Sequence, residues 1–274
     1  DKIGILFTVS GIDGIDCEIE NKEEYTTLKT LTNTKPEVLG LLPNEEYPVI
    51  IAFDSCQESV SFQMHPTDEY AKEKLGLLYG KSEAWYFIEK PSDGWVYAEN
   101  ITGDNKAVEN ALRNNNFDGV IGKYPTKKDD LIYIRSGTIH ALTKGSLIYE
   151  IQQSTNLTYR LYDYDRIDRN GNKRPLHIQE ALDNLNSDLK IQCNNFSTNT
   201  SFKEREFSLV HKEIESSFTN TNDVACAISI VSGLIKVDDY SILQGMSLLV
   251  LPNETIKIQG KANCIIAYPH SYWR

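Results

Sequence analysis

Short runs of β-branched and aromatic residues recur along this chain of 274 residues, and turn-forming residues separate them. The clearest runs span residues 47–53, 59–64, 84–89, 131–134 and 146–152. Asp93-Gly94 and Lys144-Gly145 are two of the turn signals between them. Runs of this length with glycine turns are typical of antiparallel sandwiches and barrels. The pattern therefore predicts a mainly β fold.

Helical signals are fewer and lie between the expected strands. Proline followed by acidic residues opens the segment 66–74, Asp104 is a candidate N-cap for 105–115, and Pro175 precedes an amphipathic stretch over 176–186. We expect these segments to be insertions packed on a β core. The polar stretch over residues 187–206 predicts a connection, and a second set of strands follows it. The sequence thus predicts two β units with a boundary near residue 200.

Charge and cysteine content argue against several kinds of protein. Lys and Arg number 28 against 39 Asp and Glu, a net charge of −11, and basic residues form no long run. This balance argues against nucleic-acid or membrane partners, and an anionic ligand would need a local cluster of cations. The 5 cysteines are scattered and never spaced as Cys-x-x-Cys, so a disulfide framework or thiolate zinc site is not expected. The longest apolar run, near 225–235, is too short to span a bilayer. We expect a cytoplasmic protein with reduced thiols.

Four candidate metal ligands lie in or beside the expected strands. Gln63 and His65 are two residues apart in an extended segment, so their side chains share one face while their apolar neighbours share the other. Glu83 begins the next strong strand, and His140 follows a Ser-Gly-Thr turn at another strand. Two imidazole nitrogens with amide and carboxylate oxygens suit a borderline divalent ion such as zinc, with room left for water or substrate.

Each of these residues also has an ordinary structural interpretation. A lone histidine in a half-buried strand is more often a hydrogen-bonded core residue than a ligand, and a glutamine is rarely a ligand at all. A single glutamate such as Glu83 is most often a surface acid. Only the joint arrangement of the four residues favours a metal site.

Four segments carry a resemblance to a known family. They span residues 61–71 (SFQMHPTDEYA), 80–89 (GKSEAWYFIE), 136–145 (SGTIHALTKG) and 149–171, which begins YEIQQSTNLTYRLYDYDR. In order and spacing they resemble type I mannose-6-phosphate isomerases, zinc-dependent members of the cupin superfamily, in their short bacterial form. The resemblance implies two jelly-roll, cupin-like β-sandwich units: a metal-binding domain over 1–190 with helical insertions, and a C-terminal domain over 200–274 without metal.

The resemblance also implies a reaction and a set of site residues. Mannose 6-phosphate and fructose 6-phosphate would be interconverted through a cis-enediolate, with one Zn²⁺ per chain and a sugar phosphate as the partner, in a monomer or weak homodimer. The implied zinc ligands are Gln63, His65, Glu83 and His140. The implied catalytic residues are Lys81, Glu150 and Arg160, and the implied substrate-binding residues are Lys81, Arg160 and Arg166.

Several of these assignments remain open at the level of sequence. The charged residues around Arg160 and Arg166 also fit a structural ladder of salt bridges, and Lys81 fits an ordinary exposed lysine. Which residue moves the proton, and which of Lys81, Arg160 and Arg166 binds phosphate, is not decided by the sequence.

Two departures from the family motivate an alternative function. Ala52 stands where the family commonly has a lysine, and the family's first thirty or so residues have no counterpart here. The alternative is a catalytically impaired or altered-substrate relative, a zinc-bearing sugar-binding or regulatory cupin. A cupin oxygenase fits less well, because such enzymes normally hold a redox-active iron with several histidines.

Overall fold

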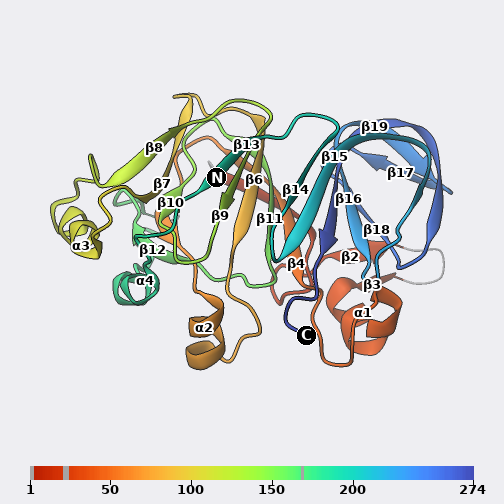
Figure 1. The fold of residues 1–274 in the computed structure, drawn as a ribbon, viewed down its shortest axis with the longest axis horizontal. Coiled ribbons are helices and arrows are strands. Elements are labelled where there is room, and N and C mark those ends of the chain that lie inside the picture. Colours follow the sequence, from red (N-terminus) through yellow and green to blue (C-terminus); the bar gives the residue numbers. More distant parts are fainter. Residues whose placement is uncertain (1–2, 21–24, 168–169) are drawn as a thin grey trace. The chain divides into compact units, whose positions relative to one another are not determined.

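The computed structural model describes residues 3–20, 25–167 and 170–274, and strands make up most of its regular structure (Figure 1). The chain divides into two compact units. The first contains Asp54–Asn195 and the residues up to Ile5, and the second contains Leu6–Phe53 and Phe196–Arg274. No helix among the described residues is long and apolar enough to cross a bilayer. The predicted mainly β fold is confirmed.

The observed division passes between Asn195 and Phe196 and groups Leu6–Phe53 with the C-terminal residues, whereas the domains predicted from the sequence span residues 1–190 and 200–274. Leu6–Phe53 belongs with the C-terminal strands because its contacts lie there. The Tyr47 hydroxyl donates to the Ala225 carbonyl over 2.8 Å, and the Ala225 N–H donates to Leu39 over 2.9 Å. Glu45 pairs with Arg274 near the end of the chain. Contacts of such long sequence separation leave no periodic signal in the sequence.

Two antiparallel sheets build the first unit. The smaller has the order β12 (Tyr159–Tyr162), β5 (Phe62–Met64), β10 (His140–Ala141), β7 (Trp95–Asn100) and β8 (Ile121–Pro125). The larger has the order β1 (Ile3–Val9), β4 (Val49–Cys56), β11 (Leu147–Gln153), β6 (Glu83–Glu89), β9 (Asp130–Ile134) and β13 (Gln192–Asn195). β1 and β4 each begin in one unit and end in the other.

The alternation predicted for β5 is present in the packing of the first unit. Phe62 and Met64 join an apolar cluster with residues of α3 (Asn105–Asn114) and α4 (Ile178–Asn184), so this face of the smaller sheet packs on helices. A second cluster contains Trp85 of β6 and Val96 of β7, which belong to different sheets. Gln63 lies on the face opposite Phe62 and Met64, and this face is turned toward the larger sheet.

The three expected helical insertions are present, and side-chain caps mark the start of two of them. Asp104 accepts a hydrogen bond from the Lys106 N–H and begins α3. The Thr67 hydroxyl accepts from the Tyr70 N–H and begins α2 (Asp68–Tyr70), which continues as the π-helical turn η2 (Ala71–Leu75). A further helix, α1 (Leu28–Thr34), was not expected, because its threonine-rich sequence has a weak intrinsic helix preference.

The second unit is built on one antiparallel sheet. Its strand order is β14 (Thr200–Lys203), β15 (Phe207–Thr219), β19 (Thr255–Pro269), β16 (Cys226–Val237) and β17 (Tyr240–Leu243), and β18 (Ser247–Val250) also pairs with β16. β2 (Glu18–Glu20), β3 (Tyr25–Thr27), α1 and the 3₁₀ helix η1 (Pro36–Leu39) complete it. Irregularities at Glu215–Ser216 and Ile230–Ser232 interrupt the register of the long strands, as bulges that bend a sheet do.

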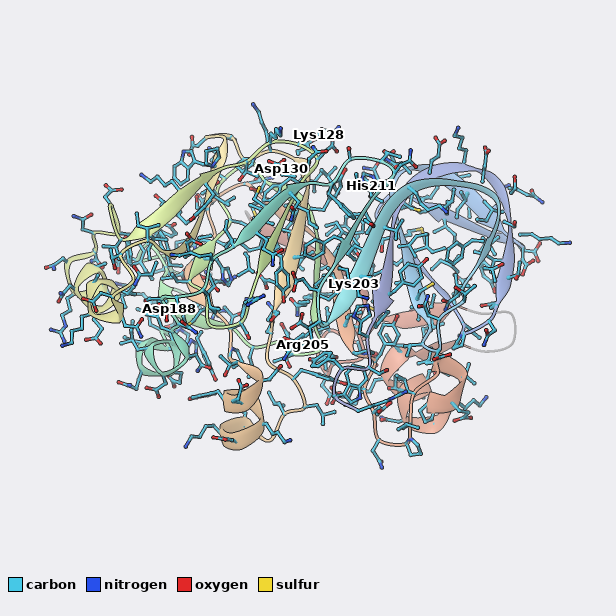
Figure 2. All side chains as sticks on the ribbon, in the orientation of Figure 1. Lys128, Asp130, Asp188, Lys203, Arg205 and His211 are labelled. Carbon is cyan, nitrogen blue, oxygen red and sulfur yellow. The ribbon has the colours of Figure 1, made fainter. Side chains whose placement is uncertain are left out.

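His211 lies on β15 of this second unit (Figure 2). It is buried, and its Nδ1 lies 2.6 Å from the Phe196 carbonyl oxygen. Metal-ligating side chains do not gather around it in the described part of the chain. The C-terminal unit was expected to lack metal, and a structural role for His211 remains our interpretation.

Gly40 provides a test of packing in the second unit. It follows η1 with a φ of +76°, and a Cβ at this position would overlap the carbonyl oxygen of Asp223. We expect Gly40→Ala to lower the free energy of unfolding by more than about 2 kcal/mol, because the left-handed backbone alone costs about 1–2 kcal/mol in a non-glycine residue. Urea unfolding of the purified variant measures the loss.

Gly14→Ala is the matched control for this prediction. Gly14 has a φ of +83°, but a Cβ there would have no neighbour within 4 Å. The free energy of unfolding of this variant should fall by no more than the backbone cost of about 1–2 kcal/mol. Equal losses in the two variants would contradict the role assigned to the Asp223 contact.

Candidate metal centre

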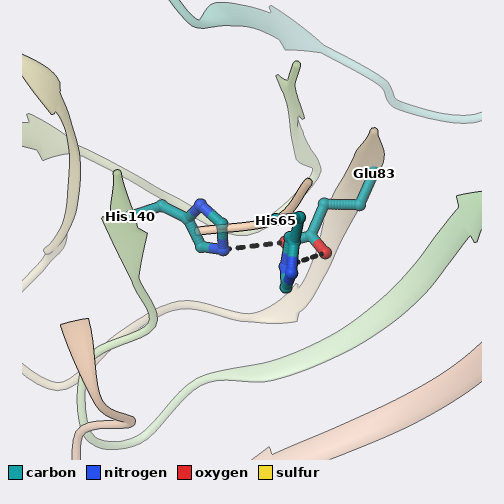
Figure 3. A group of neighbouring side chains, drawn as sticks. All are labelled: His65, Glu83 and His140. Carbon is teal, nitrogen blue, oxygen red and sulfur yellow. Dashed lines mark ion pairs between the residues drawn. The ribbon is translucent and has the colours of Figure 1, made fainter. Parts of the chain in front are cut away.

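Three predicted ligands meet between the two sheets of the first unit. His65 directly follows β5, Glu83 begins β6 and His140 begins β10. His65 Nε2 lies 3.0 Å from Glu83 Oε2, and His140 Nε2 lies 3.4 Å from Glu83 Oε1 (Figure 3). The ligand atoms of all three residues lie within 4.8 Å of one another, and all three side chains are buried. Residues far apart in sequence therefore form one candidate metal site.

Backbone carbonyls orient both imidazole rings. His65 Nδ1 lies 2.8 Å from the Leu157 oxygen, and His140 Nδ1 lies 2.8 Å from the Thr138 oxygen. A carbonyl can only accept, so in each ring Nδ1 carries the proton and, in a neutral ring, Nε2 presents a lone pair. Burial lowers the pKa of His65 and lowers that of His140 to about 3, which keeps both rings neutral at pH 7. Imidazoles held in this way are ready to bind a metal through Nε2.

The atoms that converge here lack the proton that would make their contacts hydrogen bonds. Neither Nε2 atom nor either Glu83 oxygen has a hydrogen-bond partner among the described residues. Burial would raise the pKa of Glu83, but the nearby Lys81 ammonium favours the charged form and the pKa lies below its usual range, so the carboxylate is ionised. The Nε2 lone pairs face the Glu83 carboxylate at 3.0 and 3.4 Å, and the carboxylate repels them. A cation bound among them would remove this repulsion, so the donor set fits a metal.

Gln63 lies beside this group in the smaller sheet. It is paired with His140 on one side and with Arg160 on the other. Residues directly opposite in antiparallel strands have their side chains on the same face. Gln63, His140 and Arg160 therefore form a row on the face that carries the candidate metal site.

Lys81 and Glu150 adjoin the site on the larger sheet. Lys81 is only 6% exposed, and its Nζ lies 3.2 Å from Glu83 Oε2 and 3.9 Å from Glu150 Oε1. Trp85 Nε1 donates to Glu150 Oε2 over 3.2 Å. Burial, together with the charges of Glu83 and Asp54, raises the pKa of Glu150 well above its usual value. Lys81 is thus a buried cation between acids and not the exposed lysine of the structural interpretation.

Arg160 is half-buried, and its backbone is held in place. Its N–H donates to His177 Nδ1 over 3.2 Å, and its carbonyl accepts from the His177 N–H over 2.8 Å. Its Nε is buried and has no hydrogen-bond partner among the described residues. Burial and the nearby Arg174 lower the pKa of Arg160, although an arginine stays charged at neutral pH. This guanidinium is available to an anionic group.

Arg166 differs from Arg160 in its contacts. It bonds to the Asp163 side chain and donates through Nη1 to the Ser59 carbonyl over 2.8 Å. Arg174 also binds Asp163, through Nε over 2.7 Å and Nη2 over 2.5 Å. These contacts match the salt-bridge interpretation of this segment. They place two arginines, Arg166 and Arg174, on Asp163, and Arg160 is near enough to interact with this group through its charge, so positive charge is in local excess.

Two residues near the site were missed in the sequence. Arg174 lies beyond the quoted motifs, and its link to Asp163 is a contact that spacing does not reveal. Asp54 directly follows the apolar run 47–53 but is still within β4, and it is buried. An acid inside a strand of buried residues was the available signal, because ionisable groups are rarely buried without a partner.

Known proteins resemble the chain in sequence, although no family model matches it. The probable mannose-6-phosphate isomerase GmuF of Bacillus subtilis is 34% identical over 157 residues, 57% of this chain and 50% of that protein. The mannose-6-phosphate isomerase of Streptococcus mutans is 35% identical over 54% of this chain and 47% of that protein. The putative mannose-6-phosphate isomerase YvyI of B. subtilis is 28% identical over 89% of this chain and 81% of that protein. The chain thus spans about half the length of the first two relatives.

Solved structures resemble the fold over nearly the whole chain. The mannose 6-phosphate isomerase of B. subtilis superposes with a TM-score of 0.82 and 24% identity, over 97% of this chain and 89% of that one. A putative mannosephosphate isomerase of Archaeoglobus fulgidus gives a TM-score of 0.72 and 17% identity, over 98% and 87%. Together these similarities confirm the resemblance to mannose-6-phosphate isomerases that the motifs predict, and the solved structures agree with the mainly β fold.

Proposed function

We propose that this protein is a zinc-dependent aldose–ketose isomerase that interconverts mannose 6-phosphate and fructose 6-phosphate. The observation that carries the proposal is the convergence of His65, Glu83 and His140 beside the buried Lys81 and Glu150. The names of the sequence relatives support the choice of reaction. We further propose that the enzyme acts in the cytoplasm as a monomer or weak homodimer.

Zinc is the metal that the donor set favours. His65, His140 and Glu83 would hold it, and Gln63 would add an amide oxygen from the same face. Nitrogen and oxygen donors of this kind suit a borderline, redox-inactive dication. When bound, such an ion acts as a Lewis acid that stabilises negative charge on neighbouring substrate oxygens.

The chain's own groups would supply proton transfer and charge. The reaction takes a proton from one carbon and returns it to the neighbouring carbon, so it needs a group that can both accept and donate. Glu150 and Lys81 are the candidates, since both adjoin the proposed metal ligands and their side chains are only 13% and 7% exposed. We infer that Arg160 stabilises the negative charge that develops on the substrate oxygens. The phosphate would lie toward Arg166 and Arg174, where positive charge exceeds negative.

A coupled assay tests the proposed function directly. Zinc-loaded protein should convert mannose 6-phosphate to fructose 6-phosphate, and metal analysis should find one zinc per chain. Removal of zinc with a chelator should abolish turnover, and added zinc should restore it. Removal of zinc should also lower the Tm, since a ligand at 1,000 times its Kd stabilises the folded state by about 4 kcal/mol. Absence of turnover in protein that holds one zinc per chain would reject the isomerase.

Ala52 supports a second candidate, an impaired or altered-substrate relative. It is buried in β4, so no cation is available at this position. If the second candidate is right, the wild-type protein has almost no isomerase activity and Ala52→Lys raises it by at least tenfold. If the first is right, the wild type is active and the substitution lowers activity, because a lysine must be accommodated in a buried position. The coupled assay on both proteins separates the two.

A further inference from the structure

Asp54 is a buried acid to which the proposed reaction gives no role. It lies on β4 within the first unit, and it is 7% exposed. Its Oδ1 atom has no hydrogen-bond partner in the described part of the chain. A buried carboxylate oxygen without a donor costs free energy, and most buried polar atoms in native proteins are paired. Such an atom is explained if a bound molecule supplies the missing donor.

The surrounding charges show which part of the centre Asp54 faces. Besides burial, the groups that act on Asp54 are the Lys81 ammonium, which favours its ionised form, and the Glu83 carboxylate, which opposes it. Burial is the largest influence and raises the pKa of Asp54 to about 7. Asp54 also acts on Glu150. In the larger sheet, β4, which carries Asp54, is the neighbour of β11, which carries Glu150. Asp54 therefore lies toward the Lys81 and Glu150 side of the candidate metal centre.

Asp54 does not belong to the compact group of metal ligands. The ligand atoms of His65, Glu83 and His140 lie within 4.8 Å of one another, and no Asp54 oxygen meets that condition with them. Nor does it form an ion pair within 4.0 Å with Lys81, whose described partners are Glu83 and Glu150. Direct metal ligation and direct pairing with the lysine are thus both disfavoured. A neutral donor from a bound ligand is a type of partner that remains.

We propose that Asp54 is a specificity-determining residue whose Oδ1 accepts a hydrogen bond from a hydroxyl group of the sugar substrate. The proposal rests on the proposed function, because a sugar phosphate must bind at the metal centre. A sugar is rich in hydroxyl donors, and a hydrogen bond to a charged acceptor is stronger than one between neutral groups. An unpaired acid in an apolar strand lowers the stability of the fold. Its presence is better explained by recognition of a ligand than by stability.

Three variants test this assignment. Asp54→Leu removes the acceptor and fills the space, and Asp54→Asn keeps an oxygen acceptor but removes the charge. Asp130→Asn is the matched control, because Asp130 is 6% exposed in the same unit but its Oδ2 accepts from the Lys127 N–H over 2.9 Å. Metal-free Asp54→Leu and Asp54→Asn should gain roughly 2–4 °C in Tm, since an unpaired buried acid is removed. Asp130→Asn should lose stability.

Ligand binding gives the second measurement. Binding of mannitol 6-phosphate, which cannot isomerise, should weaken roughly 10- to 150-fold in zinc-loaded Asp54→Leu, the range expected for a hydrogen bond to a charged group. Asp54→Asn should lose less, and zinc content should remain one per chain in both. Monodeoxy derivatives of mannitol 6-phosphate identify the hydroxyl. For the derivative that lacks it, wild type and Asp54→Leu should bind equally.

Each contrary result has a separate meaning. Loss of zinc from Asp54→Leu would make Asp54 a metal ligand and overturn the proposal, as would unchanged binding or an equal loss for every deoxy derivative. A drop in Tm of both Asp54 variants would make the residue structural. Binding of mannitol 6-phosphate needs no turnover. If the wild type is inactive but still binds this compound, the isomerase is rejected, and the binding measurements still decide the role of Asp54. A wild type that does not bind it would reject both.

Discussion

Replacing His65 or His140 with alanine should remove the bound metal and reduce isomerase turnover by about 1,000-fold or more. Both rings present Nε2 to Glu83 at 3.0 and 3.4 Å, and carbonyl bonds to Nδ1 fix their orientation. Loss of one nitrogen leaves too few donors to hold the ion. A Lewis acid contributes several kcal/mol to stabilisation of a charged transition state, and each 1.4 kcal/mol corresponds to a factor of ten in rate. Metal analysis after gel filtration and the coupled assay measure both effects.

His211→Ala is the matched control for these variants. His211 is also buried, and its Nδ1 also bonds to a backbone carbonyl, but it lies on β15 in the second unit. Its loss should cost stability and leave the zinc content at one per chain. The double variant with alanine at 65 and 140 is the decisive case. Retention of one zinc per chain in that protein would refute the site, because its two nitrogen donors would be absent.

The metal-binding part of the site could be predicted because its residues carry local signals. The alternation of Gln63 and His65 with Phe62 and Met64 is the period of a strand with one apolar face, and both faces of β5 are used as this pattern requires. Residue type then limits the chemistry, since histidine nitrogens and a glutamate oxygen are common metal donors. The family resemblance supplied what the residues alone left open, namely that the expected strands meet.

The remainder of the site depends on contacts that local signals do not encode. Lys81 fits an exposed lysine in sequence, yet it is buried between Glu83 and Glu150, because β6 and β11 are neighbours in the larger sheet. Asp54 ends a run of apolar residues and could equally have begun a surface turn. The same reason applies to residues 6–53, which group with the C-terminal strands, because sequence order says little about long-range packing in a β protein.

Arg160→Ala should lower kcat by roughly 100- to 1,000-fold, the loss typical of removing one preorganised donor to a developing oxyanion. Arg160 lies opposite Gln63, on the same face as His140, and its Nε has no partner among the described residues. Its backbone is bonded to His177 at both N–H and carbonyl, so the substitution should leave β12 in place. Arg160→Lys should recover little activity, because an ammonium does not reproduce the planar donor geometry of a guanidinium.

Arg174→Ala separates the role of Arg160 from phosphate binding. Arg174 bonds to Asp163 in the arginine cluster formed by Arg160, Arg166 and Arg174, and its side chain is 41% exposed. If the phosphate lies toward this cluster, Arg174→Ala should raise KM for mannose 6-phosphate and change kcat little, while Arg160→Ala should act mainly on kcat. An effect of Arg160→Ala on KM alone would assign Arg160 to the phosphate and remove it from the reacting end of the sugar. The charge on the substrate oxygens would then have to be stabilised by Lys81, whose Nζ lies 3.2 Å from the proposed ligand Glu83.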